Sequence, residues 1–174
     1  MAKLYTKNGD NGETFLLFGK KVSKLDARVQ CYGAIDECIS NLGAAYSLSV
    51  EKDDKDISDL ILKIQRTLFI ISSEIACPTE KYNDLKEKYK YINEEVITDL
   101  EKKIDKYQSI TPKINYFVLP GGSLISSFID IARTSCRRSE RLCVEVRDLN
   151  QLNNKNILIY LNRLSDLLFI LARY

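Results

Sequence analysis

The sequence Arg133-Thr-Ser-Cys-Arg-Arg-Ser-Glu-Arg141 lies inside a long segment that otherwise favours a buried helix. A helix turns by about 100° per residue, so Arg133, Arg137 and Arg141 fall within a stripe about 80° wide. Glu140 lies beside that stripe, and Arg138 lies at its far edge. Apolar and small side chains occupy the opposite arc, so one face packs and the other concentrates guanidinium groups. Because like charges four residues apart repel, the stripe needs acidic partners, a second subunit or a polyanionic ligand.

Apolar residues recur with the period of a helix on both sides of this stretch. We expect the arginine helix to run from about Ser123 to Asp148, with Asp26 capping an earlier helix. The other helices are expected at about 26–50, 58–76, 93–108 and 153–173. We find no internal repeat and no linker that would divide the chain. The prediction is therefore an all-α, up-and-down five-helix bundle in one domain, with residues 25–174 forming the bundle.

The connecting segments have a different composition. Residues 1–24 are expected to be non-helical, because Lys7-Asn-Gly-Asp-Asn-Gly-Glu-Thr14 has turn formers at nearly every position. With Lys20, Lys21 and Lys24 nearby, this loop could cradle an anion, or it could be a surface loop with solvated lysines. Residues 78–91 read as a loop or a short helix, and residues 114–122 as an extended apolar stretch closed by Pro-Gly-Gly.

The composition excludes several classes of function. The chain of 174 residues has a net charge of +2 and no histidine. Histidine-based acid–base catalysis, Ser-His-Asp triads and histidine metal sites are therefore ruled out. The near-zero charge gives no general attraction to nucleic acid. The five cysteines include no C-x-x-C and are expected to be buried thiols in a reducing cytosol. With no apolar signal region at the start and no run long enough to cross a bilayer, we expect a cytoplasmic protein.

Three readings of the arginine face remain open on these grounds. The first is an ion-pair network between helices or subunits. The second is a nucleic-acid surface, which the lack of a basic stripe elsewhere counts against. The third is a phosphate-bearing small ligand, which suits the planar, two-pronged donor geometry of arginine. Five acidic residues are placed to neutralise arginines in the first reading: Asp36, Glu37, Asp130, Glu140 and Asp166.

Several segments taken together, in order, resemble one family. These are Thr6–Gly12, Tyr32–Glu37, Phe117–Gly122 followed by Arg133–Arg141, and Tyr160–Asp166. They resemble the PduO-type ATP:cob(I)alamin adenosyltransferases over nearly the whole chain. The resemblance implies a homotrimer of five-helix bundles with active sites at the subunit interfaces.

The resemblance also implies roles for individual residues. Asp36 and Arg133 match an ion pair at the subunit interface, and Phe117 matches an aromatic residue at the lower axial face of cobalt. Asn8 and Asn11 stand where the family pattern usually has Thr and Lys. ATP would be contacted by Thr6, Lys7, Gly9, Asp10, Asn11, Gly12, Lys24, Arg137, Glu140, Arg141 and Asn162. Mg²⁺ would be bound mainly through the ATP phosphates, with no protein ligand assigned.

The implied reaction transfers the 5′-deoxyadenosyl group of ATP to the cobalt of cob(I)alamin and releases triphosphate. Reduced cobalt is itself a strong nucleophile, so no general base is required. A reductase would reduce cob(II)alamin, and an adenosylcobalamin-dependent enzyme could receive the product; no nucleic acid or membrane partner is implied. The alternative is a non-catalytic trimeric helical protein that binds nucleotide or cobalamin.

Overall fold

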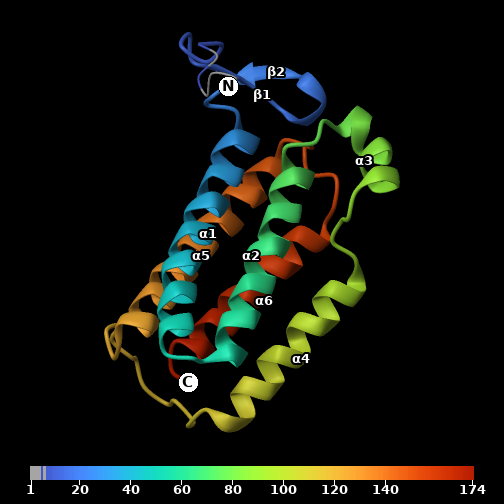
Figure 1. Ribbon diagram of the computed structural model, residues 1–174. Helices are drawn as coiled ribbons and strands as arrows, with labels where there is room; N and C mark the ends of the chain where they lie inside the picture. Colours follow the sequence, from blue (N-terminus) through green and yellow to red (C-terminus); the bar gives the residue numbers. More distant parts are fainter. Residues whose placement is uncertain (1–4, 6) are drawn as a thin grey trace.

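Five long helices run alternately up and down through the molecule (Figure 1). The computed structural model describes Tyr5 and residues 7–174, so Thr6 lies outside the described residues. The long helices are α1 (Ala27–Glu51), α2 (Lys55–Ile75), α4 (Glu94–Ile110), α5 (Leu124–Asp148) and α6 (Asn156–Leu171). The predicted up-and-down bundle is therefore present, and the arginine stretch lies in the middle of α5.

Side-chain caps explain where four of the helices begin. Asp26 and Asn93 accept bonds from the backbone amides of Arg28 and Val96, as their positions before α1 and α4 predict. Ser123 forms a reciprocal capping box at the start of α5. Asp54 caps α2, which therefore begins three residues before the predicted Ser58. The last helix, α6, begins at Asn156 rather than Asn153.

Residues 7–174 are mostly helical, but the chain is not purely α-helical and has a sixth, short helix. Between α2 and α4, residues 78–91 include a 3₁₀ turn, η2 (Thr79–Lys81), and a short helix, α3 (Tyr82–Lys88), in agreement with one of the two readings of this segment. Before α1, the strands β1 (Glu13–Phe15) and β2 (Lys21–Ser23) form an antiparallel hairpin around the turn η1 (Leu17–Gly19). Strands of three residues are too short to show an alternating pattern, which is why the sequence does not reveal them.

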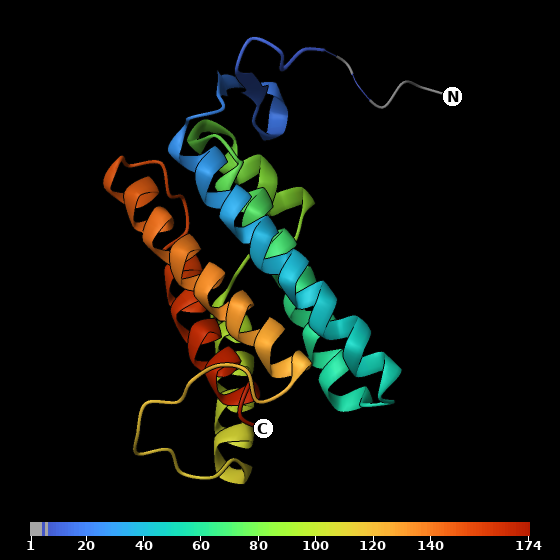
Figure 2. The same ribbon diagram turned by 90° about the vertical axis from the view of Figure 1, so that its left-hand side faces the viewer.

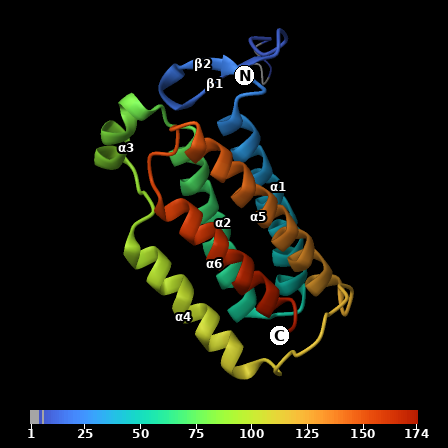
Figure 3. The ribbon, with the colours of Figure 1, turned by 180° about the vertical axis from the view of Figure 1, so that it is seen from behind.

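The core lies between the long helices. Helix α1 packs against α5 and α2, while α6 packs against α5 and α4. Figures 2 and 3 show the result, with α5 between α1 and α6 and with the hairpin lying over the N-terminal end of α1. The 111–123 connection and the C-terminus lie at the other end of the bundle. Aliphatic side chains fill the interior, including the fully buried Ile35, Ile61, Leu68 and Leu161.

Cysteines line the contact between α1 and α5. All five cysteines are buried and unbridged, as predicted. The Cys31 Sγ lies 3.6 Å from the Ser139 carbonyl oxygen, and the Cys38 Sγ lies 3.3 Å from that of Ala132. Hydrogen bonding to a neighbouring thiol and burial both raise the pKa of Cys31 and Cys136, which keeps these thiols neutral. They therefore serve as small packing groups beneath the arginine face.

None of the helices in the described part of the chain combines the length and the hydropathy that crossing a membrane requires.

Candidate active site

The arginines of α5 differ in whether they have an acidic partner. Three are paired with a carboxylate: Arg133 with Asp130, Arg138 with Glu37, and Arg147 with Asp148. Arg137 and Arg141 are exposed and have no carboxylate partner among residues 7–174. Nη1 of Arg141 donates to the carbonyl oxygen of Arg137, at 3.3 Å. Two neighbouring guanidinium groups on one face are thus available to an external anion.

A polar chain from three helices flanks this pair of arginines. Asn162 on α6 donates from Nδ2 to Oε1 of Glu140 at 3.0 Å, so two predicted nucleotide ligands are in contact. Arg163 donates to Oδ1 of Asn162 at 2.9 Å and to Oε1 of Glu101 on α4 at 3.1 Å. These bonds set the orientation of the Asn162 amide and occupy the Glu140 carboxylate without neutralising Arg137 or Arg141.

Arg133 belongs to a separate, more buried cluster. Nε of Arg133 and Nη1 of Arg173 each lie 2.9 Å from Oδ1 of Asp130, which is 4% exposed. The guanidinium carbon of Arg173 lies 4.1 Å from the centre of the Phe169 ring. Asp36 is not part of this cluster. It lies on α1 and lines an open groove of about 850 Å³ between α1 and α5. Within the described chain, no ion pair joins Asp36 to Arg133.

The glycine loop is wrapped against Lys24. The backbone of Lys7 has φ 61° and that of Gly12 has φ 78°, so the chain reverses tightly between them. The Gly12 amide lies 3.2 Å from the Gly9 carbonyl oxygen, and the Lys24 amide lies 2.9 Å from that of Gly12. A Cβ atom at Gly9 would lie 3.2 Å from Nζ of Lys24, so the ammonium group lies close against the loop. Asp10 and Asn11 are exposed at the turn.

Phe117 lies in the connection between α4 and α5, which forms no regular structure. Its side chain is fully exposed, and the neighbouring Tyr116 and Leu119 are also exposed. An open groove of about 570 Å³ lies between this connection, α4 and α6, with Asp166 and Phe169 in its lining. The connection therefore presents apolar side chains that nothing within the described chain covers.

The structure brings together some of the predicted site residues and separates others. Glu140 and Asn162 are in contact, with Arg137 and Arg141 on the same helix as Glu140. Within the described chain, neither Asp10 nor Lys24 forms a hydrogen bond or ion pair with either arginine. The connection between α4 and α5, to which Phe117 belongs, lies at the opposite end of the bundle from the glycine loop (Figures 1 and 2). The glycine loop, the two arginines and the α4–α5 connection are therefore separate features within the described chain.

Two features of the site escaped the sequence analysis. The spacing of Asp130 and Arg133, three residues apart on one helix, does indicate their pairing. Nothing in the sequence indicates that Arg173 shares the same carboxylate oxygen, since the two are 43 residues apart. The link from Arg163 to Glu101 is similarly non-local.

Comparison with known proteins gives one consistent result. A family model described as cobalamin adenosyltransferase matches residues 4–174. The corrinoid adenosyltransferase of Bacillus subtilis is 41% identical over 172 residues, covering 98% of this chain and 85% of the relative. The human corrinoid adenosyltransferase MMAB is 38% identical, covering 99% of this chain and 68% of the relative.

A solved structure shares the fold over almost the whole chain. It is a variant of the PduO-type ATP:corrinoid adenosyltransferase from Lactobacillus reuteri, complexed with cobalamin and ATP. The two align with a TM-score of 0.88 and 37% sequence identity, covering 99% of this chain and 92% of the other.

Proposed function

The chain belongs to the cobalamin adenosyltransferase family, and we propose that it transfers the 5′-deoxyadenosyl group of ATP to the cobalt of cob(I)alamin, releasing triphosphate. One structural observation supports this proposal most directly. Of the arginines on α5, Arg137 and Arg141 have no carboxylate partner in the described residues, while their neighbours do. A triphosphate would supply the missing negative charge, in the geometry that guanidinium groups bind best.

The reaction needs charge stabilisation and positioning rather than proton transfer. The electron pair of reduced cobalt attacks the 5′ carbon of ATP, the bond from that carbon to oxygen breaks, and triphosphate leaves with the bonding electrons. Negative charge therefore grows on the triphosphate as the bond breaks. Arg137, Arg141 and Lys24 stabilise that charge, and alignment of the 5′ carbon with cobalt lowers the remaining barrier. The absence of histidine is no obstacle, because no general base takes part.

Magnesium fits this scheme as an ion held by the substrate. The described residues contain no cluster of three or more acidic, histidine or cysteine side chains that could hold a metal ion. Mg²⁺ would be bound mainly through the phosphate oxygens of ATP, with the exposed Asp10 carboxylate of the glycine loop available to meet the metal-bound phosphate. When bound, it would neutralise part of the triphosphate charge.

We place the complete site between two copies of the chain. Within the described part of one chain, the glycine loop and Lys24 are not bonded to Arg137 or Arg141. Asp36 faces an open groove while Arg133 is held by Asp130. In a homotrimer, the loop of one subunit would complete the arginine face of the next, and Asp36 would meet Arg133 across the same interface.

Phe117 is assigned to the corrin side of the site. It is fully exposed, on a connection whose other apolar side chains are also uncovered. A flat aromatic wall at the lower face of the corrin would exclude water and an axial ligand from cobalt. Four-coordinate cob(II)alamin accepts an electron more readily, and a separate reductase would supply that electron.

The deciding experiment uses the purified protein with ATP, Mg²⁺ and chemically reduced cobalamin. Formation of a cobalt–carbon bond is followed by absorbance, and the released triphosphate is quantified. We expect one triphosphate for each adenosylcobalamin formed. Binding of ATP without formation of adenosylcobalamin would instead support the alternative of a non-catalytic nucleotide-binding protein.

A further inference from the structure

Glu74, in the last turn of α2, is a buried carboxylate with an unusual set of partners. Its side chain is 1% exposed and makes no ion pair within the described residues. It accepts hydrogen bonds instead: from the Tyr82 hydroxyl at 2.7 Å, the Ile92 amide at 2.7 Å and Nδ2 of Asn154 at 2.8 Å. Burial of an uncompensated carboxylate is costly even when its hydrogen bonds are satisfied, so stability alone is a weak reason for this arrangement.

The partners of Glu74 come from segments that the chain order keeps apart. Tyr82 belongs to α3, Ile92 to the segment leading into α4, and Asn154 to the connection between α5 and α6. The Asn154 amide also donates to the Ile92 carbonyl oxygen at 2.8 Å. One residue earlier, Asn153 donates from Nδ2 to the Cys77 carbonyl oxygen at 3.0 Å. The α5–α6 connection is thus bonded to both the end of α2 and the turn that follows it.

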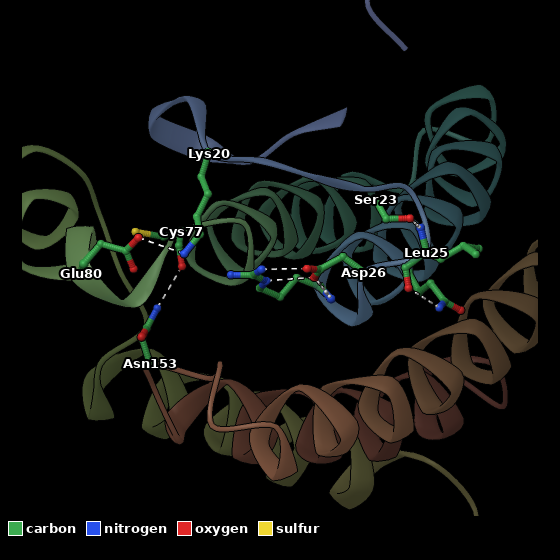
Figure 4. A network of polar contacts seen from close by, with 9 residues as sticks. Lys20, Ser23, Leu25, Asp26, Cys77, Glu80 and Asn153 are labelled. Carbon is green, nitrogen blue, oxygen red and sulfur yellow. Dashed lines mark hydrogen bonds and ion pairs between the residues drawn. The ribbon is translucent and has the colours of Figure 1, made fainter. Parts of the chain in front are cut away.

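That turn holds the N-terminal hairpin. The Leu17 amide donates to the Ala76 carbonyl oxygen at 3.0 Å, and Lys20 pairs with Glu80 at 2.9 Å. Figure 4 shows two contacts with this turn, Lys20 reaching Glu80 and Asn153 reaching the carbonyl oxygen of Cys77. Leu16, directly after the hairpin's first strand, is 4% exposed, so this part of the hairpin is buried. A two-stranded hairpin has little stability of its own, so these attachments set its orientation.

The hairpin in turn carries the glycine loop. Strand β1 follows directly after Gly12 and strand β2 ends directly before Lys24, with Glu13 paired to Ser23. The Lys24 amide bonds to the Gly12 carbonyl oxygen at 2.9 Å, which closes the base of the loop. A tilt of the hairpin on the end of α2 would therefore move the loop and the Lys24 ammonium group together.

We propose that Glu74, Asn153 and Asn154 form a polar hub that positions the glycine-loop hairpin, and that the hub thereby sets the affinity for ATP. They are positioning residues, since none of them belongs to the loop or to the arginine face. The proposal gives residues 77–92 a role: they connect the α5–α6 connection to the nucleotide loop. It rests on the proposed function for the identity of the ligand, and its first readout is independent of activity.

The test is Asn153→Ala, which removes the hydrogen bond to the Cys77 carbonyl oxygen and leaves no unpaired charge in the interior. We expect faster hydrogen exchange at the Leu17 amide in the ATP-free protein, because its acceptor on the turn is loosened. With ATP, KM should rise about fivefold, as expected for loss of one net hydrogen bond. The kcat and the KM for cob(I)alamin should stay within about twofold, since the arginine face is untouched.

Two further variants sharpen the test. Glu80→Gln breaks the exposed pair with Lys20. It should speed hydrogen exchange at the Leu17 amide and raise the KM for ATP, each by about twofold, which is less than in Asn153→Ala. If Asn153→Ala does not fold, Glu80→Gln alone tests the proposal. Asp84→Asn breaks the Lys81–Asp84 pair, which lies in the same segment but does not reach the hairpin. This matched control should leave Leu17 exchange and the KM for ATP unchanged.

The outcomes separate this proposal from the proposed function. Unchanged Leu17 exchange in both Asn153→Ala and Glu80→Gln overturns the hub as an anchor of the hairpin. Faster exchange with an unchanged KM for ATP overturns its role in positioning. If the wild-type protein makes no adenosylcobalamin, the proposed function fails. The affinity for ATP is then measured by calorimetric titration in place of KM. The same comparison of variants still decides whether the hub positions the loop.

Discussion

The arginines on α5 show how differently one residue type can be used within a few turns of helix. Arg133 shares a buried carboxylate oxygen with Arg173, which makes it part of the fold. Arg138 forms an exposed pair with Glu37. Arg137 and Arg141 lack such partners in the described chain and are the two that we assign to phosphate. The neighbouring acidic groups, rather than the positions of the arginines along the stripe, distinguish these uses.

Arg137→Lys should reduce kcat by about a hundredfold, as loss of a preorganised donor to a developing negative charge typically does. A lysine keeps the charge but cannot reproduce the two parallel bonds of the guanidinium group. Steady-state assays with saturating ATP and cob(I)alamin measure the effect. The matched control is Arg147→Lys on the same helix, whose exposed pair with Asp148 lies outside the site. Near-normal kcat in Arg137→Lys would remove this residue from the mechanism.

Asp130→Asn should destabilise the protein by about 3 kcal/mol, because it leaves two arginines without their shared carboxylate in a buried position. The Arg173 side chain is 8% exposed, so water cannot replace the lost partner. Urea unfolding measures the change. Asp148→Asn, which breaks an exposed pair on the same helix, should cost less than about 1 kcal/mol. Equal costs in the two variants would contradict the structural role of Asp130.

At the scale of elements, the site depends on the segments between helices. The long helices supply a rigid frame, with Asp26 bonded to the Arg28 side chain at the start of α1. The glycine loop and the 111–123 connection lie at opposite ends of that frame (Figure 1). Because the 5′ carbon of ATP must meet cobalt, we propose that the hairpin of one subunit and the α4–α5 connection of another contribute to the same site.

Phe117→Ala should slow the reaction that starts from cob(II)alamin more than it weakens ATP binding. Removing the ring opens the lower face of cobalt to water or an axial ligand, which makes reduction harder. Stopped-flow assays from cob(II)alamin, with electron paramagnetic resonance to report four-coordinate cobalt, provide the measurement. Phe69→Ala removes an exposed aromatic ring on α2 and is the matched control. An unchanged rate with four-coordinate cobalt intact would exclude the assigned role.

Because Glu74 is buried at the end of α2, we expect the stability of the protein to depend on pH. Burial raises the pKa of Glu74 above its ordinary value of 4.5, so the folded protein binds more protons than the unfolded chain in this range. The free energy of unfolding should therefore fall as the pH rises from about 4.5 through the raised folded pKa. Glu74→Gln cannot titrate, so the stability of the wild type relative to this variant should decline over the same window. Urea unfolding of both proteins at several pH values measures this. A difference in unfolding free energy between the wild type and Glu74→Gln that does not change with pH would show that Glu74 does not cause the pH dependence.

At the scale of the whole molecule, the described chain is a well-packed bundle with an incomplete site. Helices α1, α2, α5 and α6 enclose a core of aliphatic side chains, and the cysteines between α1 and α5 allow close packing. The exposed groups that we assign to the reaction face outward at separate places. We propose that a neighbouring subunit brings these groups together.

Mixing two inactive variants tests this arrangement directly. Lys24→Ala impairs the loop and Arg137→Lys impairs the arginine face, so each homotrimer should be nearly inactive. If each site joins the loop of one subunit to the helix of the next, about a quarter of the sites in an equal, randomly exchanged mixture have both partners intact. Activity should recover accordingly, and sedimentation should show about three times the chain mass of 20.0 kDa. A mixture that exchanges subunits and stays inactive would place the whole site within one chain.

Local rules account for much of the fold. The helical period, the caps at Asp26, Asn93 and Ser123, and the glycine-rich turn are properties of neighbouring residues, so α1, α4, α5 and the loop could be predicted. The hairpin could not, since its short strands depend on the turn after α2 for support. The match of residues 4–174 to the family model agrees with the resemblance seen in the sequence motifs.

By itself, the sequence determined that α5 would pack on one face and concentrate arginines on the other, because side-chain direction on a helix follows from position alone. Only the tertiary structure decided the pairs between elements. Arg138 reaches Glu37, and Arg173 reaches Asp130, through the packing of α1, α5 and the end of α6. Glu74 likewise gains its three donors from segments that meet only in the folded chain. Electrostatic interactions depend on distance in space, which the order of residues does not specify.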